Sequence, residues 1–322
     1  MPPIGGFFGG RPRGGRTAAA PLRRSLGGSR SGDRPAGSLP SEARRAIEYL
    51  ETPPPPVLAD VVRCGWELRG PAPRAAAGRG EPALPDGSPE LIVNFGTPFD
   101  HLREGHRPRR QPQAFLVGQI TGPFVVRPAG RVDLVAIRFE AHGAALLHRP
   151  MRELTDSWLP VPRLGLPRFA RAVAAIAARR RGRRLEALFE AVALLRRRSA
   201  PPDQRVADAV RAIRSSRGAV PLDALARSLG LTPRSLQRRF ADEVGISPKV
   251  LARIVRFQRV FAACRDEPGS LAAVAAECGY YDQPHLVRDF REFAGEAPAR
   301  ALVALPEFTA LFTARGRAEV SG

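Results

Sequence analysis

The chain has 322 residues, 43% of them hydrophobic, and a formal net charge of +20 at pH 7. This length allows two ordinary hydrophobic cores, so we expect two domains with accessory segments. The longest apolar runs, such as residues 173–178, are far shorter than the roughly 18 residues that a membrane-spanning helix needs, and no membrane partner is expected. Three scattered cysteines, Cys64, Cys264 and Cys278, argue against a disulfide framework and a cysteine-rich zinc site and favour a reducing cytoplasm.

The positive charge is not spread evenly along the chain. Residues 1–40 carry about +6 and residues 168–217 about +10, whereas residues 41–167 and 218–322 each carry about +2. Of the 51 basic residues only Lys249 is a lysine, so a general bias toward arginine explains part of the excess. The net charge alone therefore does not identify a nucleic-acid partner.

The amino-acid composition of the first half of the chain changes near residue 40. Residues 1–40 are dominated by Gly, Pro, Ser and Arg without a hydrophobic period, which predicts a disordered tail, with an organellar transit peptide as the alternative. Residues 41–167 consist of short segments rich in Val, Ile and Phe between Pro and Gly turns. This pattern is typical of a β-sandwich or barrel, and we expect a compact β-rich domain here.

The next stretch has the spacing of helices. Residues 168–204 place Ala and Leu at helical intervals up to a break at Pro201 and Pro202, and they predict a helical connector. Residues 179–184 form an arginine-rich run within it. Such a run is more often a solvated face than a phosphate-binding site, and both interpretations stay open.

One pattern occurs twice in the C-terminal third. Residues 220–245 predict a helix, a turn at Gly230, and a second helix that begins at the capping Thr232. Residues 271–293 follow the same plan, with a turn at Gly279 and a cap at Asp282. The pattern L-x-x-x-F-x-x-x-x-G-x-x-P repeats with an offset of fifty residues, at Leu236, Phe240, Gly245 and Pro248 and at Leu286, Phe290, Gly295 and Pro298.

These features predict two helix–turn–helix units. In such a unit the second helix is free to enter a major groove of DNA. The four leucine and phenylalanine positions of the pattern are expected in the core. Residues 249–266 predict one helix between the units, long enough to hold them a fixed distance apart.

The C-terminal part resembles the DNA-binding domain of the AraC/XylS transcriptional regulators. The resemblance rests on "LARSLGLTPRSLQRRF", on "RFQRV", and on "AAVAAECGYYDQPHLVRDFREFAGEAP", in that order and spacing, and it covers residues 205–305. Tyr280 stands where Phe is usual, and Pro284-His285 replace a common polar pair, which leaves the base preference open. The N-terminal half is similar to one branch of the same family through "LPDGSPELIVNFG" and two neighbouring segments.

The resemblance implies a multidomain α+β fold. A β-rich, cupin-like sensor or dimerisation domain over residues 41–167 would be followed by the connector and by an all-α domain with two helix–turn–helix units, and residues 306–322 would form a C-terminal tail. The implied function is sequence-specific transcription regulation of the bacterial type, in which two recognition helices bind adjacent major-groove segments. Double-stranded promoter DNA is the implied partner, and RNA polymerase, a small-molecule effector and a second copy of the chain are further candidates.

Residues of the second helices that are not needed for packing are the candidate DNA contacts. Arginine can bind guanine through two hydrogen bonds, glutamine can bind adenine in the same way, and an apolar side chain can contact a thymine methyl group. Solvent exposure without any contact is the alternative for each. The candidates for base contact are Arg234, Ser235, Gln237, Arg238, Gln283, Pro284, His285, Val287 and Arg288, and those for phosphate contact are Arg239 and Lys249.

The remaining histidine, aspartate, tryptophan and cysteine residues do not form a pattern that is typical of a catalytic site. The five histidines include no H-x-H or H-E-x-x-H pair, so neither a metal nor another cofactor is expected. Asp86-Gly87 predicts a turn, and Trp66 and Trp158 are expected in the core rather than in a ligand pocket. Cys64 as a redox sensor or methyl acceptor is a weaker alternative. We therefore expect no enzyme, and a DNA-targeted enzyme or modification sensor with its activity in the N-terminal domain remains the second hypothesis.

Overall fold

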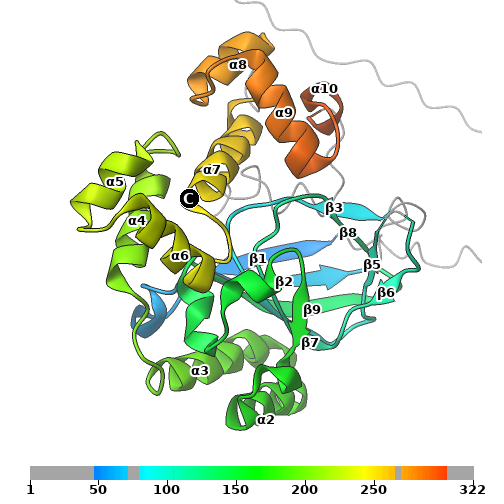
Figure 1. Ribbon diagram of the computed structural model, residues 1–322. Helices are drawn as coiled ribbons and strands as arrows, with labels where there is room; N and C mark the ends of the chain where they lie inside the picture. Colours follow the sequence, from blue (N-terminus) through cyan, green and yellow to red (C-terminus); the bar gives the residue numbers. More distant parts are fainter. Residues whose placement is uncertain (1–46, 72–79, 104, 265–269, 303–322) are drawn as a thin grey trace, which may run out of the picture. The chain divides into compact units, whose positions relative to one another are not determined.

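The computed structural model describes residues 47–71, 80–103, 105–264 and 270–302 (Figure 1). The predicted tails, residues 1–40 and 306–322, lie outside these ranges. A β-rich part comes first in the chain and a helical part follows, as the sequence predicted (Figure 1). Within the described ranges no helix is long and apolar enough to cross a membrane.

The β-rich part consists of two antiparallel sheets. All eight residues of β9 are buried, since this strand lies inside the first sheet, between β2 and β4. The first sheet has the strand order β1 (Glu48–Thr52), β2 (Val62–Gly70), β9 (Val132–Phe139), β4 (Glu90–Asn94), β7 (Ala114–Val117) and β10 (Trp158–Pro160). The second has the order β3 (Glu81–Ala83), β8 (Phe124–Arg127), β5 (Asp100–Leu102) and β6 (Arg109–Arg110).

Helices from the predicted connector cover one face of the first sheet. Leu185 and Phe189 of α3 (Arg184–Arg196) press on β2 so closely that a Cβ at Gly65 would lie 2.6 Å from each side chain. Because these residues share a hydrophobic core with β4, β7 and β9, the helices of residues 168–204 pack as part of the β-rich body. The remaining elements of this part are α2 (Pro167–Ala175) and the 3-10 helices η1 (Pro56–Leu58), η2 (Gly143–Leu147), η3 (Met151–Leu154), η4 (Val161–Leu164), η5 (Ile176–Ala178) and η6 (Arg181–Arg183).

The helical part is built around one long helix, α7 (Pro248–Ala263). Phe257 of α7 is fully buried, and its ring lies 4.9 Å from that of Phe290 and 5.4 Å from that of Phe293. Burial of such rings contributes about 2–3 kcal/mol each, so this cluster is a major source of stability. The other helices are α4 (Gln204–Ser215), α5 (Leu222–Ser228), α6 (Pro233–Glu243), α8 (Leu271–Glu277), α9 (Gln283–Ala294) and α10 (Pro298–Ala301).

The two helix–turn–helix units share their local chemistry, as the repeated pattern predicted. Every leucine and phenylalanine of the pattern is buried. Gly245 and Gly295 end α6 and α9 with φ angles of 91° and 75°, a region that glycine adopts without steric cost. A proline then occupies the first turn of α7 and of α10.

The β-rich part touches the first unit at the end of α6. The hydroxyl of Thr155 donates a 2.7 Å hydrogen bond to the carbonyl oxygen of Gly245. A Cβ at Gly245 would lie 2.8 Å from the carbonyl oxygen of Met151, which is closer than real contacts allow. Arg152 also forms an ion pair with Asp242. This close approach requires glycine for its size as well as for its backbone angle.

Substitution of Gly245 tests this contact against a matched position. Gly279→Ala is the control, because Gly279 has a similar φ of 80° but its added Cβ would meet an ordinary neighbour at 3.6 Å. Both variants carry the strain of a left-handed alanine, about 1–2 kcal/mol. Gly245→Ala should lose about 1–3 kcal/mol more, because backbone must move. Urea unfolding measures the difference, and equal losses would contradict the contact.

Candidate nucleic-acid interface

The first helix–turn–helix unit presents one polar face of α6. Gly230 follows α5 with a φ of 66°, and the hydroxyl of Thr232 accepts a 3.1 Å hydrogen bond from the backbone N–H of Ser235. This cap fixes where α6 begins, and Leu236 and Phe240 fix which side is buried. Opposite that side Arg234, Gln237 and Arg238 are exposed and Ser235 is half-buried.

The second unit follows the same construction in α8 and α9. Gly279 makes the turn with a φ of 80°, and the Asp282 carboxylate accepts a 2.7 Å hydrogen bond from the backbone N–H of His285. His285 and Val287 are half-buried, and the His285 ring meets that of Tyr280 edge-on at 5.3 Å. The exposed candidates on this helix are Gln283, Pro284 and Arg288.

A buried ion pair fastens α9 to α7. Nη2 of Arg253 lies 2.7 Å from Oδ1 of Asp289, and Nε donates to the same oxygen at 3.0 Å. Asp289 is 1% exposed, so its charge depends on this partner. Hydrogen bonds to Glu292 and then to Asp289 raise the pKa of Arg253 above its usual range, although burial opposes them. The orientation of α9 is thus set from α7.

The two candidate phosphate contacts differ in their surroundings. Lys249 is exposed at the start of α7, beside the capping Ser247. Arg239 is half-buried and forms an ion pair with Asp203, the residue that caps α4. Of these two side chains, that of Lys249 is accessible from solvent. Arg239 links α6 to α4 through its ion pair with Asp203.

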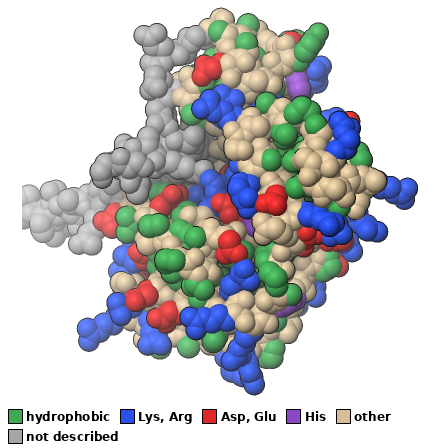
Figure 2. Space-filling model, turned by 90° about the vertical axis from the view of Figure 1, so that its left-hand side faces the viewer, with side chains coloured by type: hydrophobic (Ala, Val, Ile, Leu, Met, Phe, Trp, Pro, Cys, Tyr) green, Lys and Arg blue, Asp and Glu red, His purple; other side chains and the backbone are tan. Residues whose placement is uncertain are grey.

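Charge on the molecular surface is mixed. Figure 2 shows Lys and Arg side chains spread over the face that is turned toward the viewer, with Asp and Glu side chains between them. No single unbroken basic patch is visible on this face, in agreement with the nearly balanced charge of residues 218–322.

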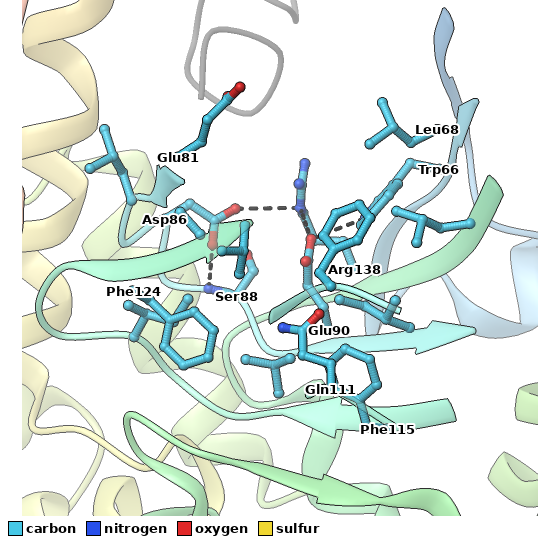
Figure 3. A pocket seen from close by; sticks show the side chains of 18 of the residues that line it. Trp66, Leu68, Glu81, Asp86, Ser88, Glu90, Gln111, Phe115, Phe124 and Arg138 are labelled. Carbon is cyan, nitrogen blue, oxygen red and sulfur yellow. Dashed lines mark hydrogen bonds and ion pairs between the residues drawn. The ribbon is translucent and has the colours of Figure 1, made fainter. Parts of the chain in front are cut away.

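A pocket that the sequence did not indicate lies between the two sheets (Figure 3). Its cavity volume is about 110 Å³, measured as the space open to the centres of water-sized molecules, which is several times what one water molecule needs. Its walls are mostly apolar and aromatic, and Trp66 from β2 is among them, so Trp66 lines a pocket while also being buried. Trp158 is buried in a neighbouring cluster with Phe115 and Phe124 and is core, as expected.

A buried arginine stands at one side of this pocket, surrounded by carboxylates. Nε of Arg138 lies 2.8 Å from Oε1 of Glu90 and 3.4 Å from Oδ2 of Asp86 (Figure 3). Nη1 of Arg138 lies 3.1 Å from Oε1 of Glu51. Burial lowers the pKa of Arg138, but Glu90 and Asp86 outweigh it and raise the pKa well above its ordinary value. Arg138 within the largely apolar strand "VDLVAIRF" is a sequence signal that could have pointed here.

Two other expectations of the N-terminal part can be compared with the structure. Asp86-Gly87 forms the predicted turn, because the Asp86 carboxylate accepts a 2.9 Å hydrogen bond from the backbone N–H of Ser88 and Gly87 has a φ of 72°. Burial raises the pKa of the Cys64 thiol to about 11, which does not favour a reactive thiolate. Among the residues that the structure describes, no group of three His, Cys, Asp or Glu could hold a metal ion.

The Arg253–Asp289 pair gives a direct test of how α9 is held. Arg253→Ala leaves a buried carboxylate without its main partner and should reduce the free energy of unfolding by about 3–5 kcal/mol. The double variant Arg253→Met, Asp289→Leu should recover much of this loss, because neither charge remains buried. Arg291→Ala, at an exposed position of the same helix, is the control and should change stability little. A small effect of Arg253→Ala in chemical denaturation would show that α9 does not depend on the pair.

Two family models match the sequence. Residues 225–302 match "Helix-turn-helix domain", and residues 50–160 match "Domain of unknown function (DUF6597)". The first range spans both units, from α5 to α10, and the second spans most of the β-rich part. No curated protein matches the chain.

Solved structures offer distant likenesses. ToxT from Vibrio cholerae O395 is 8% identical with a TM-score of 0.40, over 70% of this chain and 94% of that one. Unsaturated fatty acid bound wild-type ToxT from Vibrio cholerae strain SCE256 is 9% identical with a TM-score of 0.40, over 81% and 95%. The AraC-like transcriptional activator CuxR is 14% identical with a TM-score of 0.20, over 64% and 75%. Similarities with such low identities and TM-scores say nothing about the ligands or partners of this chain.

Proposed function

Residues 225–302 carry an AraC-type helix-turn-helix domain, and from this premise we propose that the chain is a sequence-specific transcription regulator whose helices α6 and α9 bind two adjacent major-groove segments. The observation that carries the proposal is the repetition of one capped, outward-facing helix in two units. Each second helix buries its leucine and phenylalanine and leaves arginine and glutamine side chains exposed. Those side chains can form paired hydrogen bonds with guanine and adenine.

The joining helix supports simultaneous binding. With 16 residues, α7 is about 24 Å long, and it packs against both units. Recognition helices that enter successive major-groove segments on one face of the duplex are about one helical turn, or 34–36 Å, apart. A helix of this length that contacts both units is of the right scale to hold their second helices at such a spacing. One protomer would then bind two elements.

No specific observation favours the second hypothesis, a DNA-targeted enzyme. In the pocket, the carboxylates of Asp86 and Glu90 form ion pairs with Arg138. The raised pKa of the Cys64 thiol does not favour nucleophilic or methyl-accepting chemistry. Contacts with RNA polymerase and self-association through the β-rich part remain proposals that follow from the regulator assignment.

Selection of bound sequences from a random duplex pool tests the proposal first. We expect one enriched motif with two elements, their centres about 10–10.5 base pairs apart. DNase footprinting of that operator should show protection of both elements by the full chain. Enrichment of a single element, or of no sequence, would contradict the two-segment proposal.

Variants of the recognition helices should act on separate elements. Arg234→Ala and Gln237→Ala should each weaken binding at one element, and Arg288→Ala at the other, by about 1–3 kcal/mol with a relaxed base preference there. Affinities of each variant for operators mutated in either element measure this. Arg171→Ala, an exposed arginine of α2, is the control and should leave affinity unchanged. Equal losses on every operator would show that these side chains do not contact bases.

Lys249 should behave differently, since phosphates carry no base sequence. Lys249→Ala should lower affinity by a similar factor on specific and non-specific DNA and reduce the slope of log affinity against log salt by about 1. Titrations at several salt concentrations give that slope. A loss confined to one operator sequence would contradict a phosphate contact.

A further inference from the structure

One wall of the pocket between the sheets also contacts the helical part of the protein. Segment 84–88 lines the pocket through Leu84, Asp86 and Ser88. The backbone of the same segment is hydrogen-bonded to the helical part. Nε2 of Gln258 in α7 donates to the carbonyl oxygen of Pro85 at 2.6 Å, and Nη2 of Arg214 in α4 donates to that of Gly87 at 2.9 Å.

Packing reinforces these hydrogen bonds. A Cβ at Gly87 would lie 2.7 Å from Cδ1 of Leu251 and 3.7 Å from Cγ2 of Ile254, so the turn rests directly on α7. Leu84 packs against the core of the helical part. Since Leu251, Ile254 and Gln258 lie at helical spacing, one stripe of α7 contacts the segment. A displacement of segment 84–88 therefore has to be transmitted to α7 or break these contacts.

The charges of the pocket do not suit an anion. Among the described lining residues Glu81, Asp86 and Glu90 are acidic and Arg138 is basic. Outside the lining Arg138 also pairs with Glu51, and Asp86 lies 3.9 Å from Nη1 of Arg63. An anion next to Arg138 would approach carboxylates that already neutralise it. Of the charged side chains that line the pocket three are acidic and one is basic, so a cation would have a net favourable Coulomb energy in a site of low dielectric constant.

The burial of Glu90 and the aromatic walls of the pocket also favour a cationic ligand. Burial raises the pKa of Glu90 despite Arg138, and the neighbouring Asp86 raises it further, so an added positive charge would relieve the two carboxylates. Trp66, Phe99, Phe115 and Phe124 line the rest of the space. The faces of such rings attract organic cations. An ordinary metal ion would gain nothing from these apolar walls.

We propose that this pocket binds an organic cation with an apolar body, its charged group near Asp86 and Glu90, and that segment 84–88 transmits occupancy to α4 and α7 (Figure 3). The ligand class rests on the pocket alone. The effect on DNA binding rests in addition on the proposed function, so the two are tested by separate measurements.

Three probes with one apolar body decide the ligand class. We would titrate the full chain with 4-phenylbutylammonium, 4-phenylbutanol and 4-phenylbutanoate, following the fluorescence of Trp66 in a Trp158→Phe background. The cation should bind at least tenfold more tightly than the alcohol, and the carboxylate most weakly. Tightest binding of the carboxylate, equal binding of all three, or no binding at millimolar concentration would overturn the assignment.

Two variants and a control locate the site. Asp86→Asn keeps an acceptor for the Ser88 N–H and should reduce the preference for the cation over the alcohol at least fivefold. Phe124→Leu should weaken all three probes by similar factors, because it removes part of the shared wall. Glu190→Gln, at an exposed position of α3, should change nothing. An unchanged preference in Asp86→Asn would overturn the placement of the charged group.

The coupling is tested without and with DNA. Saturating 4-phenylbutylammonium should change amide hydrogen exchange in α4 and α7, and Gln258→Ala should reduce the change in α7 while altering probe affinity less than twofold. On a selected operator the same probe should shift affinity at least threefold. Unchanged exchange in both helices would overturn the coupling. Absence of any selected operator would count against the proposed function alone.

Discussion

Burial of α7 is the constraint on which the rest of the structure depends. Its Phe257 forms the aromatic cluster with α9, and its Arg253 holds the buried carboxylate of Asp289. Nη1 of Arg256 donates a 2.6 Å hydrogen bond to the carbonyl oxygen of Gly218, just before α5. Gln258 reaches the β-rich part at Pro85. A single helix thus fixes both helix–turn–helix units and one wall of the pocket.

This arrangement explains why the same unit can occur twice in one chain with a fixed geometry. Each unit alone is a short pair of helices with a small core, and isolated helices of this length are marginal in water. Packing on a common helix supplies the missing apolar contacts and also removes the freedom of one unit relative to the other. Rigidity is therefore a consequence of how the units become stable. For a protein that binds two groove segments, that rigidity lowers the entropy lost on binding.

The parts of the fold that could be predicted from sequence are those set by local chemistry. Thr232 and Asp282 cap their helices, and Gly230, Gly245, Gly279 and Gly295 have positive φ, because each acts within a few residues of itself. The pocket depends on contacts between strands that are distant in sequence. Arg138 meets Glu90 across 48 positions and Glu51 across 87, and nothing near any of them in the sequence indicates the pairing.

For the candidate DNA contacts, too, the sequence predicts what local structure determines and not what tertiary packing determines. Helical periodicity correctly placed Arg234, Gln237, Arg238, Gln283, Pro284 and Arg288 on exposed faces. It could not show that Arg239 pairs with Asp203 on another helix, or that the residues predicted as a connector would pack on the sheet. Both depend on tertiary packing. Whether the exposed residues contact bases is a property of the complex with DNA.

The spacing of the two DNA elements tests most directly whether α7 holds the units rigidly. Operators with about 5 or about 10 base pairs inserted between the elements place the second element on the opposite face or one full turn away. A rigid pair predicts that both insertions reduce the affinity of the full chain to that of an operator with one element. Recovery of affinity with the insertion of a full turn would contradict the account, because it would require the two recognition helices to move apart by about 34 Å.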